Sequence, residues 1–296
     1  MKKKSGKRPV LRAICVILVI LLLLTAVELF YSNYVLTVST YTVSSEKVNG
    51  PIRVVFLADL HEREFGTGNR RLLKKISAQK PDVIAFVGDF INKDADKNEI
   101  EQMCAFVRNA SKIAPVYFSM GNQEKAFERD TGIKLADRLE EAGALVLDSR
   151  FLDIDIEGTL VRIGGYMGYY RTPHLNSKDS QEQKLQLAFA DDFEDTDRFK
   201  LLLNHIPTNW LDWDYRDNYP VDLVLSGHYH GGVVRIPFLE QGLYAPYAGK
   251  FPPYTKGMFV GKKATCVLTT GLAGSYGIPR FFNPPEICVV DIVPAD

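Results

Sequence analysis

Several apolar runs, far apart in this sequence, each end in side chains of the types that bind metal ions. The runs are short and almost continuously apolar, which is typical of strands buried on both faces of an α/β sheet. Ligands of such sheets collect at the carboxyl ends of the strands. The repeated pattern therefore predicts an α/β fold in which segments distant in sequence bring polar side chains into one crevice.

The first two runs end in carboxylates. Asp59 and His61 follow the run that begins at Ile52, and Asp89 follows the run that begins at Val83. Aspartate supplies an anionic oxygen and histidine a nitrogen, a mixture that suits Mn, Fe or Zn. Taken alone, Asp89 would be a helix N-cap or a turn residue. Beside the other segments it is better explained as a carboxylate whose two oxygens can each bind one ion.

The later runs end in an amide and in histidines. Asn122 follows a glycine, which is usually a turn position, although its context here favours a ligand. His205 ends a fourth apolar run. His228 and His230 stand in a glycine-rich turn after a fifth run, where the backbone can pass close to an ion. Four of the five histidines of the chain therefore stand directly after predicted strands.

A long apolar segment lies near the N-terminus, behind a cluster of positive charge. Residues 13–27 carry no charged side chain, and with their apolar flanks they reach the ~20 residues that span a bilayer. Six lysines and arginines precede Glu28, the first acidic residue. This asymmetry predicts a cytoplasmic N-terminus, a single-pass anchor within residues 1–31 and a catalytic domain outside the cytoplasm, at the cell membrane. A cleaved signal peptide is the alternative, but no small-x-small cleavage site is evident near residues 25–31.

The rest of the chain divides into a connecting strand and one large domain. Residues 32–50 alternate polar and apolar with many β-branched side chains, which predicts an edge strand, and residues 51–296 form the domain. Residues 165–198 are polar and irregular, with Arg171 and His174 near their start. They are a candidate substrate-binding insert, a plain surface loop with one helix being the alternative.

Composition excludes two classes of function. The net charge is zero, with 36 basic and 36 acidic residues, so nothing indicates a nucleic-acid-binding protein. The four cysteines show no C-x-x-C spacing, which argues against structural zinc and against thioredoxin chemistry.

In chain order the motifs are D-x-H, G-D, G-N, N-H and G-H-x-H, and this set resembles the calcineurin-like metallophosphoesterase superfamily. Residues 230–238 and 280–287 resemble the closing motifs of its small bacterial membrane-anchored branch. The resemblance covers roughly residues 50–293 and implies a four-layer α-β-β-α sandwich, here with an N-terminal transmembrane helix. It also implies two divalent metal ions, Mn, Fe or Zn. One would be held by Asp59, His61 and His230, the other by Asn122, His205 and His228, with Asp89 bridging.

The resemblance implies hydrolysis of phosphodiester or pyrophosphate bonds by attack of a metal-bridging hydroxide. Catalytic candidates are Asn122, Gln123 and His205. The predicted anchor suggests lipid-linked or envelope-derived substrates. Alternatives are a phosphomonoesterase and a weakly active metal-binding module at the membrane.

One position departs from the family's pattern. The family usually has histidine where this chain has Gln123, and that histidine is thought to stabilise the transition state or protonate the leaving oxygen. An amide can donate a hydrogen bond but cannot act as an acid. Three interpretations follow: a substrate whose leaving group needs little protonation, another acid such as His174 or a metal-bound water, or weak activity.

Overall fold

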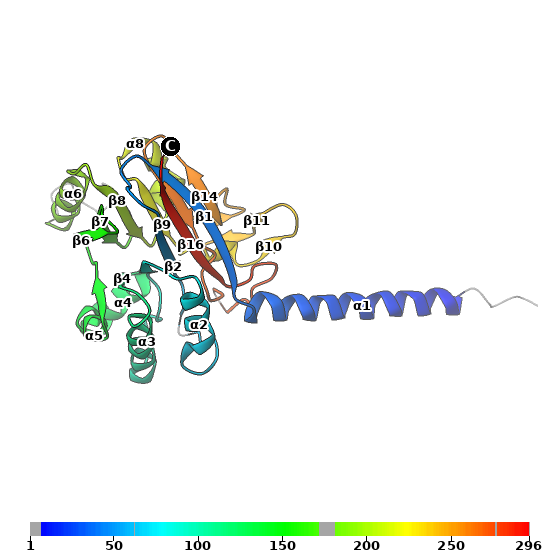
Figure 1. Ribbon diagram of the computed structural model, residues 1–296. Coiled ribbons are helices and arrows are strands. Elements are labelled where there is room, and N and C mark those ends of the chain that lie inside the picture. The colour runs from blue at the N-terminus through cyan, green and yellow to red at the C-terminus, as the bar shows by residue number, and fades with distance from the viewer. Residues whose placement is uncertain (1–6, 62, 172–180, 276, 296) are drawn as a thin grey trace, which may run out of the picture.

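The computed structural model describes residues 7–61, 63–171, 181–275 and 277–295 (Figure 1). Within these residues two six-stranded sheets pack face to face, and helices cover their outer faces. This is the four-layer α-β-β-α sandwich that the sequence predicts.

The first sheet contains most of the predicted N-terminal strands. Its strands are β1 (Thr37–Ser45), β2 (Ile52–Leu57), β3 (Val83–Val87), β4 (Val116–Ser119), β5 (Ala144–Val146) and β16 (Glu286–Pro294). Their order is β1-β16-β2-β3-β4-β5. Strands β2 to β5 are mutually parallel, so the loops that follow β2, β3 and β4 emerge at one edge.

The second sheet has the order β14-β15-β9-β8-β7-β6. Strands β7, β8, β9 and β15 are mutually parallel, and β6 and β14 are antiparallel edge strands. The bounds are β6 (Arg150–Ile156), β7 (Thr159–Tyr166), β8 (Phe199–Asn204), β9 (Leu223–Ser226), β14 (Gly257–Val260) and β15 (Thr265–Leu268). Two short hairpins follow β9, formed by β10 (Arg235–Ile236) with β11 (Gln241–Gly242), and by β12 (Tyr244–Ala245) with β13 (Gly249–Lys250).

The apolar runs read from the sequence are buried on both faces. In β2, Val54 and Phe56 join the core between the two sheets, whereas Val55 and Leu57 join the core beneath the helices. In β8, Leu201 likewise faces the other sheet. Alternate side chains of one strand thus enter two different cores, which explains why these strands are continuously apolar instead of alternating with polar residues.

Helices cover both outer faces. Helices α2 (Arg70–Ala78), α3 (Lys97–Ala110) and α5 (Leu135–Glu141) pack on the first sheet, and α6 (Gln181–Glu194) and α7 (Thr208–Leu211) pack on the second. The remaining helical segments are α4 (Asn122–Thr131), α8 (Tyr215–Asn218), η1 (Thr67–Asn69) and η2 (His230–Gly232).

The apolar N-terminal segment forms α1 (Lys7–Tyr34), which projects away from the body of the molecule (Figure 1). Its 28 residues correspond to about 42 Å of helix, enough to cross a bilayer. Its apolar side chains are exposed, as a membrane helix requires, although a signal sequence would share this property. The chain then enters β1, which pairs with β16 over nine residues and forms the edge of the first sheet.

Candidate metal centre

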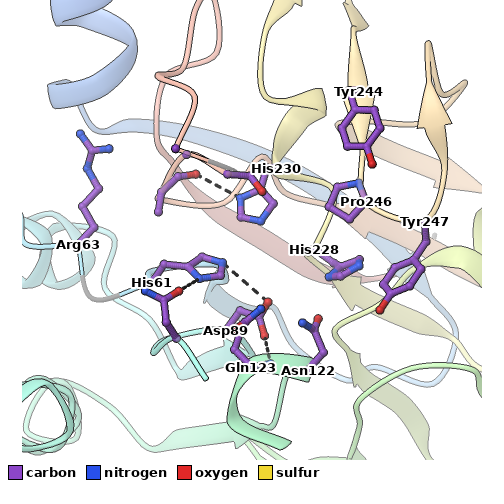
Figure 2. A pocket seen from close by; sticks show the side chains of 15 residues that line it. His61, Arg63, Asp89, Asn122, Gln123, His228, His230, Tyr244, Pro246 and Tyr247 are labelled. Atoms are coloured by element: carbon purple, nitrogen blue, oxygen red, sulfur yellow. Dashed lines mark hydrogen bonds and ion pairs between the residues drawn. The ribbon is translucent and has the colours of Figure 1, made fainter. Parts of the chain in front are cut away.

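Loops from both sheets bring the predicted ligands to one place. Each loop follows the carboxyl end of a parallel strand, so the two sheets contribute to a single crevice (Figure 2). The loops supply Asp59 and His61 after β2, Asp89 after β3, Asn122 after β4, His205 after β8, and His228 and His230 after β9.

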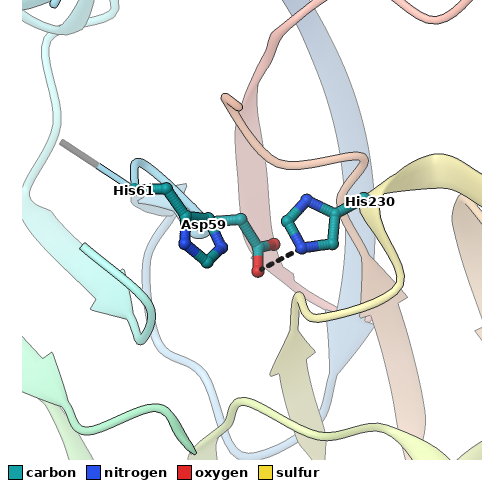
Figure 3. A group of neighbouring side chains, drawn as sticks. All are labelled: Asp59, His61 and His230. Carbon is teal, nitrogen blue, oxygen red and sulfur yellow. Dashed lines mark ion pairs between the residues drawn. The ribbon is translucent and has the colours of Figure 1, made fainter. Parts of the chain in front are cut away.

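Two groups of three side chains are arranged so that each could hold one ion. Asp59, His61 and His230 offer ligand atoms that all lie within 4.8 Å of one another (Figure 3). Within this group, His230 Nε2 is 3.6 Å from Asp59 Oδ1. The group therefore combines a carboxylate oxygen with two imidazole nitrogens at one point.

The second group consists of Asp89, His205 and His228, whose ligand atoms likewise all lie within 4.8 Å of one another. His205 Nε2 lies 3.1 Å from Asp89 Oδ2, and the same oxygen is 3.8 Å from His61 Nε2 of the first group. Asp89 thus belongs to the second group and also lies beside the first. A carboxylate in this position has the geometry of a bridging ligand.

Several ligand-type atoms are buried without a hydrogen-bond partner in the described part of the chain. They are His61 Nε2, Asn122 Oδ1, His205 Nε2 and both ring nitrogens of His228. A buried polar atom left without a partner costs ~1–3 kcal/mol. Such atoms, gathered at one point beside two aspartates, fit a site in which metal ions are the missing partners.

Neighbouring groups fix which nitrogen of three histidines faces the site. Because a carbonyl oxygen can only accept, Nδ1 must donate from His61 to Asn92 (2.8 Å), from His205 to Val87 (2.7 Å) and from His230 to Ala273 (3.3 Å). Nε2 is then the nitrogen that each ring turns toward the site, and in the neutral ring it is free to act as a ligand, which is the arrangement found around protein metal sites.

Burial and neighbouring charges together set the pKa values of the ionisable groups in the crevice. Burial lowers the pKa of His230 to about 4 and that of His228 well below its usual value, so both imidazoles are neutral at pH 7. Burial also disfavours the charged form of His205, but Asp89 and Asp59 outweigh it and raise the pKa of His205 to about 9. Burial opposes ionisation of Asp89, yet His205, His61 and His228 hold its pKa below the usual range. An ion that binds His205 must therefore displace a proton.

Comparison with known proteins identifies the family to which this geometry belongs. The sequence pattern of the calcineurin-like phosphoesterases matches residues 52–232, which run from the start of β2 to the end of the H-x-H turn. The chain belongs to this family. It is therefore a metal-dependent phosphoester hydrolase.

Three curated relatives extend the similarity beyond the matched region. An uncharacterised metallophosphoesterase of Campylobacter jejuni is 27% identical, over 92% of this chain and 68% of the relative. Phosphodiesterase YaeI of Escherichia coli is 24% identical, over 82% and 83% respectively. UDP-2,3-diacylglucosamine pyrophosphatase LpxG of Chlamydia muridarum is 25% identical, over 81% and 83%.

The crevice of this phosphoesterase is built from unusual backbone. Asp59, His61, Asp89, His228 and His230 all have positive φ, between 44° and 70°. Few residues other than glycine adopt this region, and such strain concentrates at functional sites. The turns direct successive side chains of one segment, such as Asp59 and His61, toward the same point.

Glycines let the backbone lie directly against the two aspartates. A Cβ atom on Gly121 would come within 2.2 Å of Asp89 Oδ1. On Gly227 and on Gly271 it would come within 2.7 Å and 2.6 Å of Asp59 Oδ2. Any larger residue at these positions would displace a carboxylate.

Glu124 has a structural role that the sequence did not reveal. Its fully buried carboxylate accepts hydrogen bonds from the backbone N–H groups of Asp89 (2.9 Å), Phe90 (2.6 Å) and Gly121 (2.8 Å). It therefore ties the loop that carries Asp89 to the start of α4. Its place in the first turn of a helix is the available sequence signal, since an acidic residue there often accepts from the N-terminal backbone.

Gln123, the departure from the family pattern, lies in the crevice with a defined orientation (Figure 2). Its backbone N–H donates to Asp89 Oδ1 (2.9 Å). Its side-chain Oε1 accepts from the backbone N–H of Lys93 (3.0 Å). Because a backbone N–H can only donate, the atom it meets must be the amide oxygen, and the amide NH₂ is left as a donor for a ligand.

The site opens into a cleft of about 800 Å³. Arg63, Tyr244 and Tyr247 line it together with the predicted ligands. The ring of Tyr247 stacks on that of His228, with centroids 5.0 Å apart and planes at 21°. Sequence analysis missed all three residues, because they lie outside the strand-end motifs.

The structure places one of the two predicted substrate-binding residues. Arg171 forms ion pairs with Asp191 (2.6 Å) and Glu194 (2.8 Å) of α6 and is not among the described residues that line the cleft. The structure thus ties Arg171 to a covering helix and does not bring it to the metal groups. His174 lies outside the described residues.

Proposed function

We propose that this protein is a membrane-anchored, dinuclear phosphoesterase that hydrolyses phosphodiester or pyrophosphate bonds. The observation that carries the proposal is the set of buried, unpartnered ligand atoms in two adjoining groups, with Asp89 of the second group 3.8 Å from His61 of the first. In the proposed assignment, one ion is held by Asp59, His61 and His230 and the other by Asn122, His205 and His228, with Asp89 between them.

The donor set favours Mn, Fe or Zn. Mg²⁺ prefers an all-oxygen shell, whereas this site offers four imidazoles beside its carboxylates and one amide. Two such ions would neutralise the charge of a phosphoester and lower the pKa of a water at the site. The protein's own contribution is to turn Nε2 of each ring toward the site, through Ala273, Asn92 and Val87, and to exclude bulk water from the buried side of the site.

Gln123 favours pyrophosphates and aryl esters, aryl diesters among them, over alkyl esters. Its NH₂ group can donate to a phosphoryl oxygen, but it cannot deliver a proton to a leaving alkoxide. Aryl and phosphoryl leaving groups depart without that proton. Two relatives are named as a phosphodiesterase and a pyrophosphatase, which supports a diester or a pyrophosphate as the substrate.

We propose the topology and domain boundaries that the charge asymmetry predicts. Residues 1–31 would be a cytoplasmic basic segment and anchor, residues 32–50 the connecting strand, and residues 51–296 the catalytic domain outside the cytoplasm. A substrate that is lipid-linked or derived from the cell envelope fits this location.

The test is a substrate panel with the full chain in lipid nanodiscs, loaded in turn with Mn, Fe or Zn. An aryl phosphodiester, a nucleotide pyrophosphate, an aryl monoester and an alkyl monoester are compared by kcat/KM, and elemental analysis measures the metal content. We expect about two ions per chain and the highest kcat/KM for the diester or the pyrophosphate. A preference for the alkyl monoester would refute the substrate class, and full metal content without hydrolysis of any substrate would identify a binding module.

A further inference from the structure

The hairpin of β10 and β11 presents apolar side chains to the solvent. At its tip Phe238 is fully exposed and Leu239 is 68% exposed. Phe282, from the loop before β16, is 40% exposed and borders the same surface hollow as Phe238. Single exposed apolar residues are common, but a cluster on one projecting element marks an interaction surface.

The loop that carries Phe282 is attached to α1. The backbone N–H of Phe282 donates to Glu28 Oε1 (2.9 Å), and that of Asn283 donates to Ser32 Oγ (3.0 Å). In return, Asn33 donates to the carbonyl of residue 280 (2.9 Å). The last two turns of the apolar helix are therefore fixed against this loop.

The hairpin is attached to the same loop. The backbone N–H of Arg235 donates to the carbonyl of Phe281 (2.9 Å), and a parallel bridge joins Val234 to Phe281. The Arg235 guanidinium bonds to the carbonyl of Gly231 and to Thr255 Oγ1, which holds the base of the hairpin. The hairpin thus lies beside the end of α1 and projects on the same side of the body (Figure 1).

The contact with Glu28 sets the depth of this surface relative to α1. The uncharged segment 13–27 ends at Glu28, and the helix continues six residues further to Tyr34, about 9 Å along its axis. Phe282 is held at Glu28 and not at the end of the helix. If residues 13–27 fill the hydrocarbon core, Phe282 and the adjacent hairpin tip lie at the headgroup interface.

We propose that Phe238, Leu239 and Phe282 form a lipid-contacting surface that inserts into the interface of the same bilayer that α1 spans. Aromatic and aliphatic side chains beside a membrane-bound element are favourable at this depth, whereas in water they would remain exposed. The inference rests on the proposed membrane anchoring and is independent of the substrate preference.

The position of the loop has a consequence for the substrate. Its first part, including Ala273, Gly274 and Ser275, lines the cleft, and its last part carries Phe282. The mouth of the cleft is therefore held next to the bilayer surface. A phosphoester in a lipid headgroup would reach the site without leaving the membrane.

The test places nitroxide spin labels on the full chain. The chain is loaded with zinc and reconstituted in nanodiscs of phosphatidylcholine and phosphatidylglycerol. Phe238→Cys carries the label, in a Cys15→Ala background, because the other three cysteines are buried. The matched control is Val260→Cys, because Val260 is also apolar and is 70% exposed. Val260 pairs with Thr265, so it lies at the end of β14 that is farther from the metal centre than the end that pairs with Leu268. Hydrolysis of a water-soluble aryl diester should be unchanged in both variants, which checks their folding.

Power saturation separates the outcomes. We expect the label at position 238 to be relaxed by oxygen, which is concentrated in lipid, and protected from a water-soluble nickel chelate. The label at position 260 should show the reverse. Equal exposure of both labels to the chelate would overturn the lipid contact, and protection of position 238 from both reagents would assign the surface to another protein copy. Recovery of the chain in the lipid-free fraction would overturn both the anchoring and this inference. If that lipid-free chain still hydrolyses the substrates of the panel, the proposed phosphoesterase activity stands.

Discussion

Replacing Gln123 by histidine tests whether the chain lacks an acid for the leaving group. The backbone N–H of residue 123, which donates to Asp89 Oδ1, is kept in any variant, so the site itself should remain in place. The side-chain bond to the Lys93 backbone is lost, and because that group is exposed the cost in stability is ~0.5–1 kcal/mol. Gln123→Leu is the matched control, since it removes the amide donor without adding an acid.

The two variants are expected to differ in how their effect depends on the leaving group. A positioned acid contributes ~10²–10⁴-fold, so Gln123→His should accelerate poor leaving groups by about 10²-fold and change good ones little. A hydrogen bond to a charged group is worth ~1.5–3 kcal/mol, which corresponds to a loss of roughly 10- to 150-fold in Gln123→Leu. That loss should be similar for every leaving group, because the NH₂ group contacts the phosphoryl oxygen.

The assay is a series of aryl phosphodiesters whose phenols span a range of acidity. The slope of log kcat/KM against the pKa of the phenol should be steep in the wild type and shallow in Gln123→His. Gln123→Leu should keep the slope of the wild type, with every value of kcat/KM lowered by the same factor. Equal slopes in the wild type and Gln123→His would refute the argument. If His174 serves as the acid instead, His174→Ala should steepen the slope and Gln123→His should gain nothing.

Three further predictions follow from the site and the anchor. Asp89→Ala should lose both metal ions by elemental analysis, while the exposed Asp137→Ala keeps them; two ions retained in Asp89→Ala would contradict the bridging role. Lys256→Met leaves the buried Glu286 carboxylate without its 2.6 Å ion pair and should lower the free energy of unfolding by about 2 kcal/mol, less than the ~3–5 kcal/mol of a fully buried pair because Lys256 is partly exposed. Urea unfolding at pH 7 measures this loss, and equal stability of both proteins would refute it. A reporter fused after Asp296 should be active outside the cytoplasm, whereas a soluble product that begins near residue 28 or 32 would show a cleaved signal peptide.

The sequence predicts the sheets because strands that are buried on both faces are continuously apolar. Phe56 and Leu57 are adjacent and both apolar, since each enters a different core. The same strands end at one edge, so the side chains that follow them must converge, and His205 of the second sheet indeed lies 3.1 Å from Asp89 of the first. This part of the site depends only on strand direction.

Other parts depend on contacts that no local pattern encodes. Glu124 is an ordinary acidic residue of a helix until the loop of Asp89 folds over it. The sequence offers Arg171 as a substrate-binding candidate in a polar insert, and only the structure shows that Glu194, 23 positions later, pairs with it. Tyr247 reaches His228 from a hairpin whose place on the body is fixed by tertiary contacts alone. Such residues are found only when the packing is known.

Helix α1 and the candidate metal centre are connected through one loop. The Asn283 side chain, whose backbone meets α1 at Ser32, donates to the carbonyls of His230 (2.8 Å) and Val233 (3.0 Å). The loop also supplies the Ala273 carbonyl that accepts from His230 Nδ1. Strand β16 continues from this loop and pairs along its length with β1, the strand that leaves α1. Because these contacts run through hydrogen-bonded backbone and not through a flexible linker, the tilt of α1 in a bilayer would fix the direction in which the cleft opens.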